Sequence, residues 1–342
     1  MTSEKLRDFA ALGEEWMTLE ARARFSVFQG WGWVGCLAVE RYDDPIVLRA
    51  QIGGRLVGLA LFNRSGRFLH LHESGDPARD RPFIEHNGPL LAHDAPTDTA
   101  TALMRCAWTA ARGKGLRLSG VSAALLDAAG GVAWRRQLRP SPCIDLCKMG
   151  AEWLSTISAN TRQQLRRSER SYREQGELRI EAATSSEAVD AALNELMTLH
   201  DLRWEEKGAF ATPFLHRFHK TLCTRLMVRN ELDLLRVTAG DALVGLLYNF
   251  RREGRVMAYQ SGWVDPKGDA RRKPGLTCHH QAILLAIRRG DRHYDFLAGG
   301  QRYKTSLARG GEDLHWAEMV RPTSWRGVLA QLRNYRSRHS AT

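Results

Sequence analysis

The chain contains an internal repeat, and this repeat constrains its fold most. Residues 48–64, LRAQIGGRLVGLALFNR, align without gaps with residues 235–251, LRVTAGDALVGLLYNFR, and eight of the seventeen positions are identical. In each copy a glycine-containing pair, Gly53-Gly54 or Gly240-Asp241, supplies a tight turn between two β-rich flanks. Each copy therefore reads as strand, turn and strand, and the repeat predicts two copies of one folding unit.

The segments that follow the two copies agree as well. RFLHLHESG, a loop, a helical stretch ending in AWTAARGKG and the strand LRLSGV follow the first copy; RVMAYQSGWV, a loop, HHQAILLAIRRG and YDFLAG follow the second. Two glycine hairpins could converge on similar sequences, but the shared order favours a tandem duplication. We therefore expect an α/β fold made of two similar domains, residues 1–150 and residues 151–342.

Positive charge is concentrated in the second half. The chain of 342 residues has a formal net charge of +12; residues 1–150 hold 19 Lys+Arg and 16 Asp+Glu (+3), and the remainder holds 31 and 22 (+9). The excess predicts an anionic partner for the second half, and nucleic acid, an anionic membrane surface and a phosphate-rich cofactor all fit. The N-terminal residues have charges throughout and no apolar core, so we expect no secretion signal and a cytoplasmic protein.

One stretch, DARRKPGLTCHHQAI at residues 269–283, places three cations where a helix should begin. Pro274 suits the first turn of a helix, and the exposed N–H groups of that turn attract anions. The corresponding loop of the first copy contains Asp94 and Asp98 and no Lys or Arg, so only the second copy should bind an anion. A solvated basic turn before an ordinary helix is the alternative. We expect no metal site at Cys278-His279-His280, because no second ligand cluster stands at a suitable spacing.

Arg272-x-x-Gly275-x-Thr277 resembles the pyrophosphate loop of the GNAT N-acyltransferases, with Thr where that pattern has Gly or Ala. The likeness is closer to the double-GNAT branch of FemAB-like and CelD-like acetyltransferases. It is carried in chain order by residues 158–180, 199–210, 258–266, 273–283 and 294–308, although AGGQRYK replaces the acidic RGDEPYK type of run. The resemblance implies two GNAT folds, each a mixed, mostly antiparallel sheet flanked by helices. The first would be a degenerate supporting or acceptor lobe, and the second would bind acyl-CoA.

The resemblance also implies which residues contact the donor. A splayed strand that includes Tyr259 would expose backbone N–H groups to the acyl carbonyl, although a plain amphipathic strand is the alternative. The residues expected to contact acyl-CoA come from this strand and from the basic loop; they are Gln260, Ser261, Gly262, Trp263, Arg271, Arg272, Lys273, Gly275, Leu276 and Thr277.

Further residues are candidates for catalysis and acceptor binding. His200, Arg203 and Trp204 lie at i, i+3 and i+4 of an expected helix, so His200 could accept the ammonium proton and Arg203 could hold an anionic group; a structural histidine is the alternative. The other candidates are Tyr303 as proton donor to the thiolate, Lys304 for phosphate or acceptor, Glu85 as an acceptor-side carboxylate, and Asn160 and Arg162 on an Arg-rich helix that could reach CoA phosphate or a lipid headgroup.

The C-terminal stretch gives a second indication of a partner. Its apolar side chains form one helical stripe, and arginines lie beside it; the stripe is Trp325, Val328, Leu329, Leu332 and Tyr335, and the arginines are Arg326, Arg333, Arg336 and Arg338. Such a helix either lies on an anionic membrane or packs on the core. The first case would place the protein at the inner face of the cytoplasmic membrane.

The sequence therefore predicts a CoA-dependent N-acyltransferase that brings donor and acceptor together in a ternary complex. Acyl-CoA would be a donor substrate, with no tightly bound cofactor, and the acceptor would be the amine of a lipid long-chain base or of an amino sugar. A FemAB-like enzyme that uses aminoacyl-tRNA is the first alternative. It predicts a larger continuous cationic surface and aromatic stacking positions, which we do not find. The second alternative is a non-catalytic nucleic-acid-binding protein, but two α/β lobes with an anion site between a loop and a helix are more than such a module needs. The sequence leaves the oligomeric state open.

Overall fold

The computed structural model describes residues 1–112, 114–204, 208–308 and 310–339, and the chain divides into two compact units. The N-terminal unit consists of Met1–Arg139 and Asp313–Thr342, and the C-terminal unit consists of Pro140–Glu312. The side chains of Met149, Ala151, Trp204 and residues 334–339 lie outside the described part. None of the described helices combines the length and apolar character needed to cross a bilayer.

This division differs from the predicted boundary near residue 150, because two strands cross from one unit to the other. Strand β13 (Gly310–Val320) pairs with β6 (Gly115–Val121) in the N-terminal unit, with Met319 opposite Leu116. It therefore carries the C-terminal helix into the N-terminal unit rather than the C-terminal one. The end of β7 (Val132–Asp145) pairs with β12 (His293–Asp295) in the C-terminal unit.

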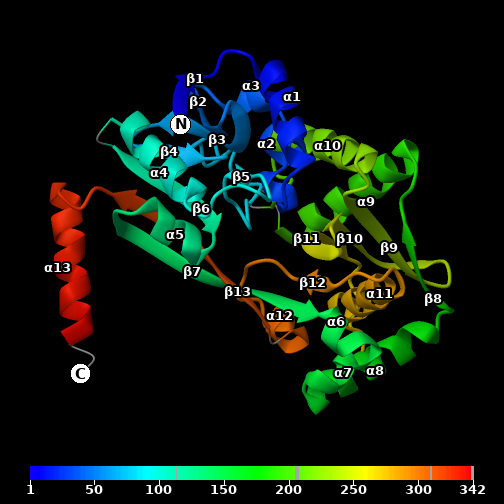
Figure 1. Ribbon diagram of the computed structural model, residues 1–342. Helices are drawn as coiled ribbons and strands as arrows, with labels where there is room; N and C mark the ends of the chain where they lie inside the picture. Colours follow the sequence, from blue (N-terminus) through cyan, green and yellow to red (C-terminus); the bar gives the residue numbers. More distant parts are fainter. Residues whose placement is uncertain (113, 205–207, 309, 340–342) are drawn as a thin grey trace. The chain divides into compact units, whose positions relative to one another are not determined.

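The sheet of the N-terminal unit has the order β1-β2-β3-β4-β6-β13, with β5 paired to β3 (Figure 1). Its remaining strands are β1 (Thr2–Lys5), β2 (Pro45–Ile52), β3 (Arg55–Ser65), β4 (Phe68–Leu71) and β5 (Leu90–Leu91). Its helices are α1 (Phe9–Glu20), the 3-10 turn η1 (Val27–Gln29), α2 (Trp31–Val34), α3 (Ala38–Arg41), α4 (Thr99–Ala110), α5 (Ala123–Ala129) and α13 (Trp325–His339).

The sheet of the C-terminal unit has the order β7-β12-β11-β10-β9-β8. Its further strands are β8 (Leu178–Ala182), β9 (Leu232–Ala239), β10 (Ala242–Arg252) and β11 (Arg255–Trp263). Its helices are α6 (Leu146–Met149), the 3-10 turn η2 (Gly150–Glu152), α7 (Trp153–Thr156), α8 (Ala159–Arg173), α9 (Ser186–Trp204), α10 (Pro213–Val228), α11 (Pro274–Arg288) and α12 (Arg302–Leu307).

The repeat in the sequence is a repeat in the structure. Strands β9 and β10 begin and end 187 residues after β2 and β3, so the two hairpins superimpose in sequence without a gap. Even the irregularity in the pairing recurs, because Val57 and its counterpart Val244 are each the extra residue at a shift of register. The prediction of two similar α/β units is therefore confirmed.

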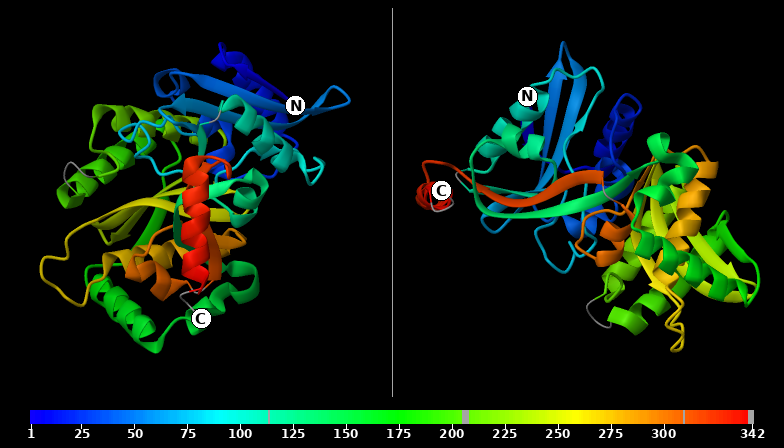
Figure 2. Two further views of the ribbon diagram at one scale, coloured as in Figure 1. Left: turned by 90° about the vertical axis from the view of Figure 1, so that its left-hand side faces the viewer. Right: turned by 90° about the horizontal axis from the view of Figure 1, so that it is seen from below.

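Two layers of helices cover the sheet of the C-terminal unit. A Cβ on Gly262 of β11 would come within 2.9 Å of Leu199 and 3.0 Å of Leu196, so α9 packs closely on that face. The next residue, Trp263, points to the other face and approaches the start of α11 at Gly275. Apolar side chains of α11, such as Ile283, are buried against the strands. Residues near the end of β11 therefore lie between two helices, α9 and α11 (Figures 1 and 2).

Candidate functional site

The start of α11 has two backbone N–H groups for which the described residues offer no acceptor. Lys273 is the N-cap residue and Pro274 the first residue of the helix. The N–H of Lys273 donates to the Ser168 hydroxyl at 2.8 Å, and the N–H of Thr277 donates to the Lys273 carbonyl at 3.0 Å. The N–H groups of Gly275 and Leu276 have no acceptor among the described residues. Together with the positive end of the helix dipole, these two donors form a place for an anion.

Packing does not explain the glycine at position 275. A Cβ added there would lie 3.6 Å from the Trp263 indole, which is an ordinary van der Waals distance. A glycine inside the first turn also costs about 0.5–1 kcal/mol of stability relative to alanine. The fold alone would therefore accept alanine, and the absent side chain leaves room beside the two N–H groups.

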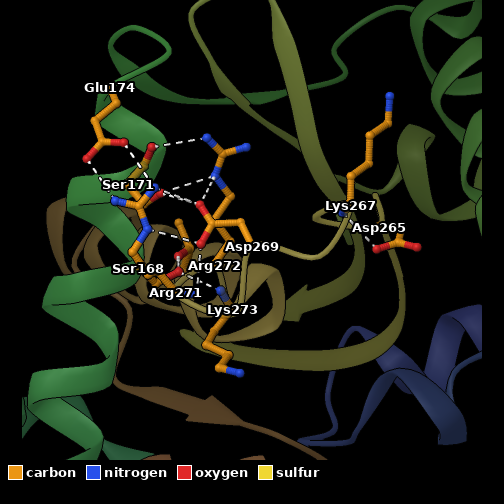
Figure 3. A network of polar contacts seen from close by, with 10 residues as sticks. Ser168, Ser171, Glu174, Asp265, Lys267, Asp269, Arg271, Arg272 and Lys273 are labelled. Carbon is orange, nitrogen blue, oxygen red and sulfur yellow. Dashed lines mark hydrogen bonds and ion pairs between the residues drawn. The ribbon is translucent and has the colours of Figure 1, made fainter.

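The structure differs from the prediction at the two arginines of the basic loop (Figure 3). Arg271 donates to both carboxylate oxygens of Asp269, at 3.0 and 2.9 Å, and also contacts Glu174, the residue that follows α8, at 3.3 Å. Arg272 lies 3.4 Å from the same aspartate and donates to the Ser171 hydroxyl at 3.2 Å. The hydrogen bond from Arg271 holds the pKa of Asp269 far below its usual range. Two acids of the protein itself thus balance the charge predicted for phosphate.

The third cation of the loop, Lys273, is exposed and has no acidic partner among the described residues. It borders a polar pocket of about 390 Å³ between the loop and α8. Asn160 lines this pocket as well, so the structure brings together two of the predicted residues. The other lining residues are Gln163, Gln164, Arg167, Ala270 and Arg271.

Two predicted binding residues have structural contacts instead. The Arg162 guanidinium caps the end of α7, where it donates to the carbonyl oxygens of Leu154, Ser155 and Ile157 at 3.3, 3.1 and 2.6 Å. Thr277 is fully buried, and its hydroxyl lies 2.8 Å from that of Ser168. Its threonine side chain, unusual for the loop pattern, fits because α8 places a small hydroxyl residue opposite.

Strand β11 has an open edge. It pairs in parallel with β12 only from Arg255 to Met257, and no described strand pairs with its β12-facing edge after that. On its other edge the pairing with β10 shifts register so that Tyr259 is an extra residue, which is a β-bulge. Residues 258–263 therefore have one edge along which no described strand pairs, and the expected contact of this edge with an acyl carbonyl stays a prediction.

The corresponding place in the N-terminal unit is closed. Strand β4 pairs in parallel with β6 only from Phe68 to His70, 187 residues before the pairing of β11. Beyond that point the amide of Asn87 bridges the gap, because it donates to the carbonyl oxygens of Leu71 and Ser119 at 3.1 Å each. The Asn87 carbonyl oxygen also lies 2.9 Å from His72 Nδ1. The N-terminal unit thus fills with its own chain the gap that the C-terminal unit keeps open.

His200 lies beside the open strand. It is buried on α9, hydrogen-bonds with the Gln260 side chain of β11 and packs edge-on against Phe210 at 5.0 Å between ring centroids. Burial lowers the pKa of His200, so that its imidazole is neutral at pH 7 and can accept a proton. Arg203, one turn further along α9, is exposed. Trp204 follows it, and its side chain lies outside the described residues.

Tyr303 reaches the same region from α12. Its ring stacks on His279 of α11 at 5.2 Å, and burial raises the pKa of its phenol to about 12. The hydroxyl therefore stays protonated at neutral pH. Lys304 differs from its predicted role, because its buried ammonium donates to the carbonyl oxygens of Leu297 and Ala298 at 3.3 and 3.0 Å. It contacts the loop after β12.

The remaining predicted residues lie elsewhere. Glu85 is buried in the N-terminal unit next to Gly120, and its acceptor role stays a prediction. His279 and His280 are buried in the core rather than paired at an exposed site: His280 contacts Glu169 at 2.6 Å, and burial lowers the pKa of His279 to about 3. The described residues contain no group of three His, Cys, Asp or Glu side chains suited to a metal.

Sequence reasoning missed three residues of the site. Asp269 neutralises the basic loop, Ser168 holds the start of α11, and His279 supports Tyr303. Only the first gave a local signal, because an aspartate two residues before an arginine commonly closes a turn onto that backbone N–H. Here the N–H of Arg271 does donate to Asp269, at 2.9 Å.

Comparisons with known proteins agree with this geometry. The family described as acetyltransferase (GNAT) domain matches residues 159–305. No curated protein matches the chain in sequence. Three solved structures share its fold at low sequence identity. The C-terminal domain of a putative lysylphosphatidylglycerol synthetase from Agrobacterium fabrum has a TM-score of 0.61 and 13% identity, over 95% of each chain. L-PGS from Bacillus licheniformis has a TM-score of 0.56 and 13% identity, over 93% of this chain and 95% of that one. FemX has a TM-score of 0.57 and 11% identity, over 97% of this chain and 99% of that one.

The three solved structures have such low identities that they support only a shared fold. The match to the acetyltransferase domain, in contrast, includes the residues of the candidate site. The open strand β11, the start of α11 and His200 all lie within residues 159–305. The C-terminal unit thus contains the segment that is similar to an acetyltransferase (GNAT) domain.

Proposed function

We propose that the C-terminal unit transfers an acyl group from acyl-CoA to an amine while both substrates are bound. One observation carries the proposal: the open edge of β11 leads to Trp263, which lies beside the unpaired N–H groups at the start of α11. A donor with its diphosphate on Gly275 and Leu276 could place its thioester carbonyl along residues 258–261. Such a molecule would accept from the N–H groups of Gly275 and Leu276 and would lie along the edge of β11 that no described strand covers beyond Met257.

The neighbouring side chains suit the chemistry of aminolysis. The neutral His200 imidazole would take the proton of the acceptor ammonium, and the freed amine would attack the thioester carbon. Backbone N–H groups of β11 would stabilise the oxyanion. As the C–N bond forms and the C–S bond breaks, the Tyr303 hydroxyl would protonate the leaving thiolate, and the second proton that the nitrogen loses on becoming an amide would return to the Tyr303 oxygen. None of these steps needs a covalent enzyme intermediate, a metal or a tightly bound cofactor.

Two acceptors fit the proposal, the amine of a lipid long-chain base and the amine of an amino sugar in envelope or exopolysaccharide synthesis. An aminoacyl-tRNA donor, as in FemAB-like transfer, is the competing proposal. It would use a broad cationic surface, whereas Arg271 and Arg272 are already paired with Asp269. The compact set of N–H donors favours a donor with a single diphosphate.

The test is to incubate the protein with acyl-CoAs of different chain lengths and each acceptor, and to follow thiol release together with the mass of the acylated product. A matched pair of variants locates the donor site: Lys273→Gln should raise KM for acyl-CoA about tenfold, whereas Lys267→Gln, in the same loop (Figure 3), should not change it. Transfer from aminoacyl-tRNA without thiol release from any acyl-CoA would contradict the proposal.

A further inference from the structure

The C-terminal helix α13 exposes a row of large apolar side chains. Trp325, Val328, Leu329 and Leu332 recur at helical spacing on one face, and they are 64%, 46%, 44% and 52% exposed. The opposite face holds the helix on its unit: Ala330 is 1% exposed, and a Cβ on Gly327 would come within 2.1 Å of the Arg321 carbonyl oxygen. The apolar stripe therefore faces solvent (α13 is red in Figures 1 and 2), although residues of this kind are usually buried.

A basic pocket of about 170 Å³ lies at the beginning of the stripe. Four cations and two aromatic side chains line it: Arg67, Lys114, Arg321, Arg326, Phe68 and Trp325. None of these four cations has an acidic partner among the described residues, in contrast to the arginines of the basic loop near α11. Arg326 Nε is buried and has no acceptor there either. The pocket thus concentrates positive charge that the protein does not neutralise.

Arginines also flank the stripe along the helix. Arg326 lies over the rings of Trp325 and Trp134, at 5.2 and 5.5 Å, and Arg333 lies over Trp134 at 4.2 Å. Arg333 further donates to the Trp134 carbonyl oxygen at 3.2 Å. These contacts hold the guanidinium groups of Arg326 and Arg333 beside the apolar stripe. Each guanidinium can therefore bind an anion at the surface of the apolar phase that the stripe enters.

We propose that this face of the N-terminal unit docks onto a membrane that contains anionic phospholipid. A headgroup phosphate would occupy the basic pocket, and the stripe of α13 would enter the boundary between headgroups and acyl chains. Nucleic acid would use the cations but leave the stripe exposed, and an apolar protein partner would leave the cations without counter-charge. An anionic lipid surface satisfies both at once. The inference concerns the N-terminal unit and does not depend on which donor the C-terminal unit uses.

The test is flotation of the full-length protein with phosphatidylcholine vesicles, with or without phosphatidylglycerol. The wild type should bind only the anionic vesicles, and added salt should release it. Arg326→Gln should weaken binding about fivefold, the effect of one cation near an anionic surface. The double variant Leu329→Gln, Leu332→Gln should weaken it roughly tenfold or more. Matched controls are Arg7→Gln, an exposed cation away from the pocket, and Ile52→Gln, at a residue 52% exposed like Leu332.

Three results would overturn the proposal. These are equal binding to neutral and anionic vesicles, equal weakening by Arg326→Gln and Arg7→Gln, and a dimer that buries α13 and binds no vesicles. Thermal unfolding of each variant separates loss of docking from loss of folding. If the double variant does not fold, Arg326→Gln and the salt dependence of the wild type still test whether the protein docks onto an anionic membrane.

Discussion

Arg271 and Asp269 lie two residues apart in one turn, and their side chains share two hydrogen bonds, at 3.0 and 2.9 Å. This ion pair changes how the basic loop can bind an anion. Three adjacent cations suggest a site that attracts phosphate by charge, yet Asp269 and Glu174 already balance the two arginines. The donors left for a ligand are two backbone N–H groups and the ammonium of Lys273. The arginines hold the loop against α8 and thereby position those donors.

The first prediction concerns this ion pair. Asp269→Asn should lower the free energy of unfolding at pH 7, because Arg271 and Arg272 lose their shared partner. The pKa of Asp269 lies below its unfolded value, so its contribution is present at neutral pH and is lost as the pH falls below about 4. Urea unfolding at several pH values should therefore show wild type and variant converging in acid. The control is Asp265→Asn, because Asp265 accepts the backbone N–H of Lys267 at 2.9 Å and has no ion pair among the described residues; an equal effect would contradict the prediction.

The second prediction separates stability from binding at Gly275. Replacement by alanine should stabilise the protein by about 0.5–1 kcal/mol, because alanine is favoured within a helix and its Cβ meets only Trp263, at 3.6 Å. The same methyl group narrows the space beside the two free N–H groups. The midpoint temperature of thermal unfolding should therefore rise. The dissociation constant for acyl-CoA, measured by calorimetry, should also rise, by roughly tenfold. A tighter donor complex would argue against a ligand at this corner.

The third prediction is a pH dependence set by His200. Because burial lowers its pKa below 6.5, kcat should be constant above neutrality and should fall as the imidazole becomes protonated in acid. Gln260→Glu places a carboxylate beside the ring, which should raise the pKa of His200 and move the acid limb to higher pH. Gln260→Met removes the hydrogen bond without adding charge and is the control. Rate profiles that do not move with Gln260→Glu would exclude His200 as the base.

The fourth prediction concerns Tyr303. Its pKa of about 12 keeps the phenol protonated at neutral pH, and its ring stacks on His279 at 5.2 Å. Tyr303→Phe retains the stack and removes the hydroxyl, so stability should stay within about 0.5 kcal/mol of the wild type. If the hydroxyl protonates the thiolate, kcat should fall by roughly 10²-fold with KM little changed. An unchanged kcat for donors with poor leaving groups would contradict that role.

The fifth prediction concerns the N-terminal unit. Burial, together with the nearby charge of Asp80, raises the pKa of Glu73 to about 8. This folded pKa lies above the unfolded value of about 4.5, so the contribution of Glu73 to stability is full below pH 4.5 and is lost as the pH rises towards 8. Glu73→Gln should remove that loss and stabilise the protein at pH 8 by something on the order of 1–3 kcal/mol. Unfolding by urea between pH 5 and 8 measures this; parallel curves for both proteins would contradict it.

Local sequence was sufficient wherever neighbouring residues decide the structure. The glycine turns at Gly53 and Gly240 are in the left-handed region, with φ of 55° and 57°, and they predicted both hairpins. Pro274 and Gly275 predicted where α11 begins, because a helix start depends on a few successive residues. The spacing of His200 and Arg203 predicted one helix face; both residues lie on α9, where His200 is buried and Arg203 is exposed. What the repeat could not indicate was that Asn87 closes the first copy's gap, since its three side-chain bonds connect residues 15 to 32 positions away.

By itself, then, the sequence determined two copies of one hairpin-based unit and the place where α11 begins, both of which follow from short-range patterns. Only the tertiary structure decided that β13 carries α13 into the N-terminal unit, that Glu174, which follows α8, helps to neutralise Arg271, and that Ser168 receives the N–H of Lys273. These contacts join segments about a hundred or more residues apart. Their partners are chosen by three-dimensional packing and charge balance, for which no local periodicity exists.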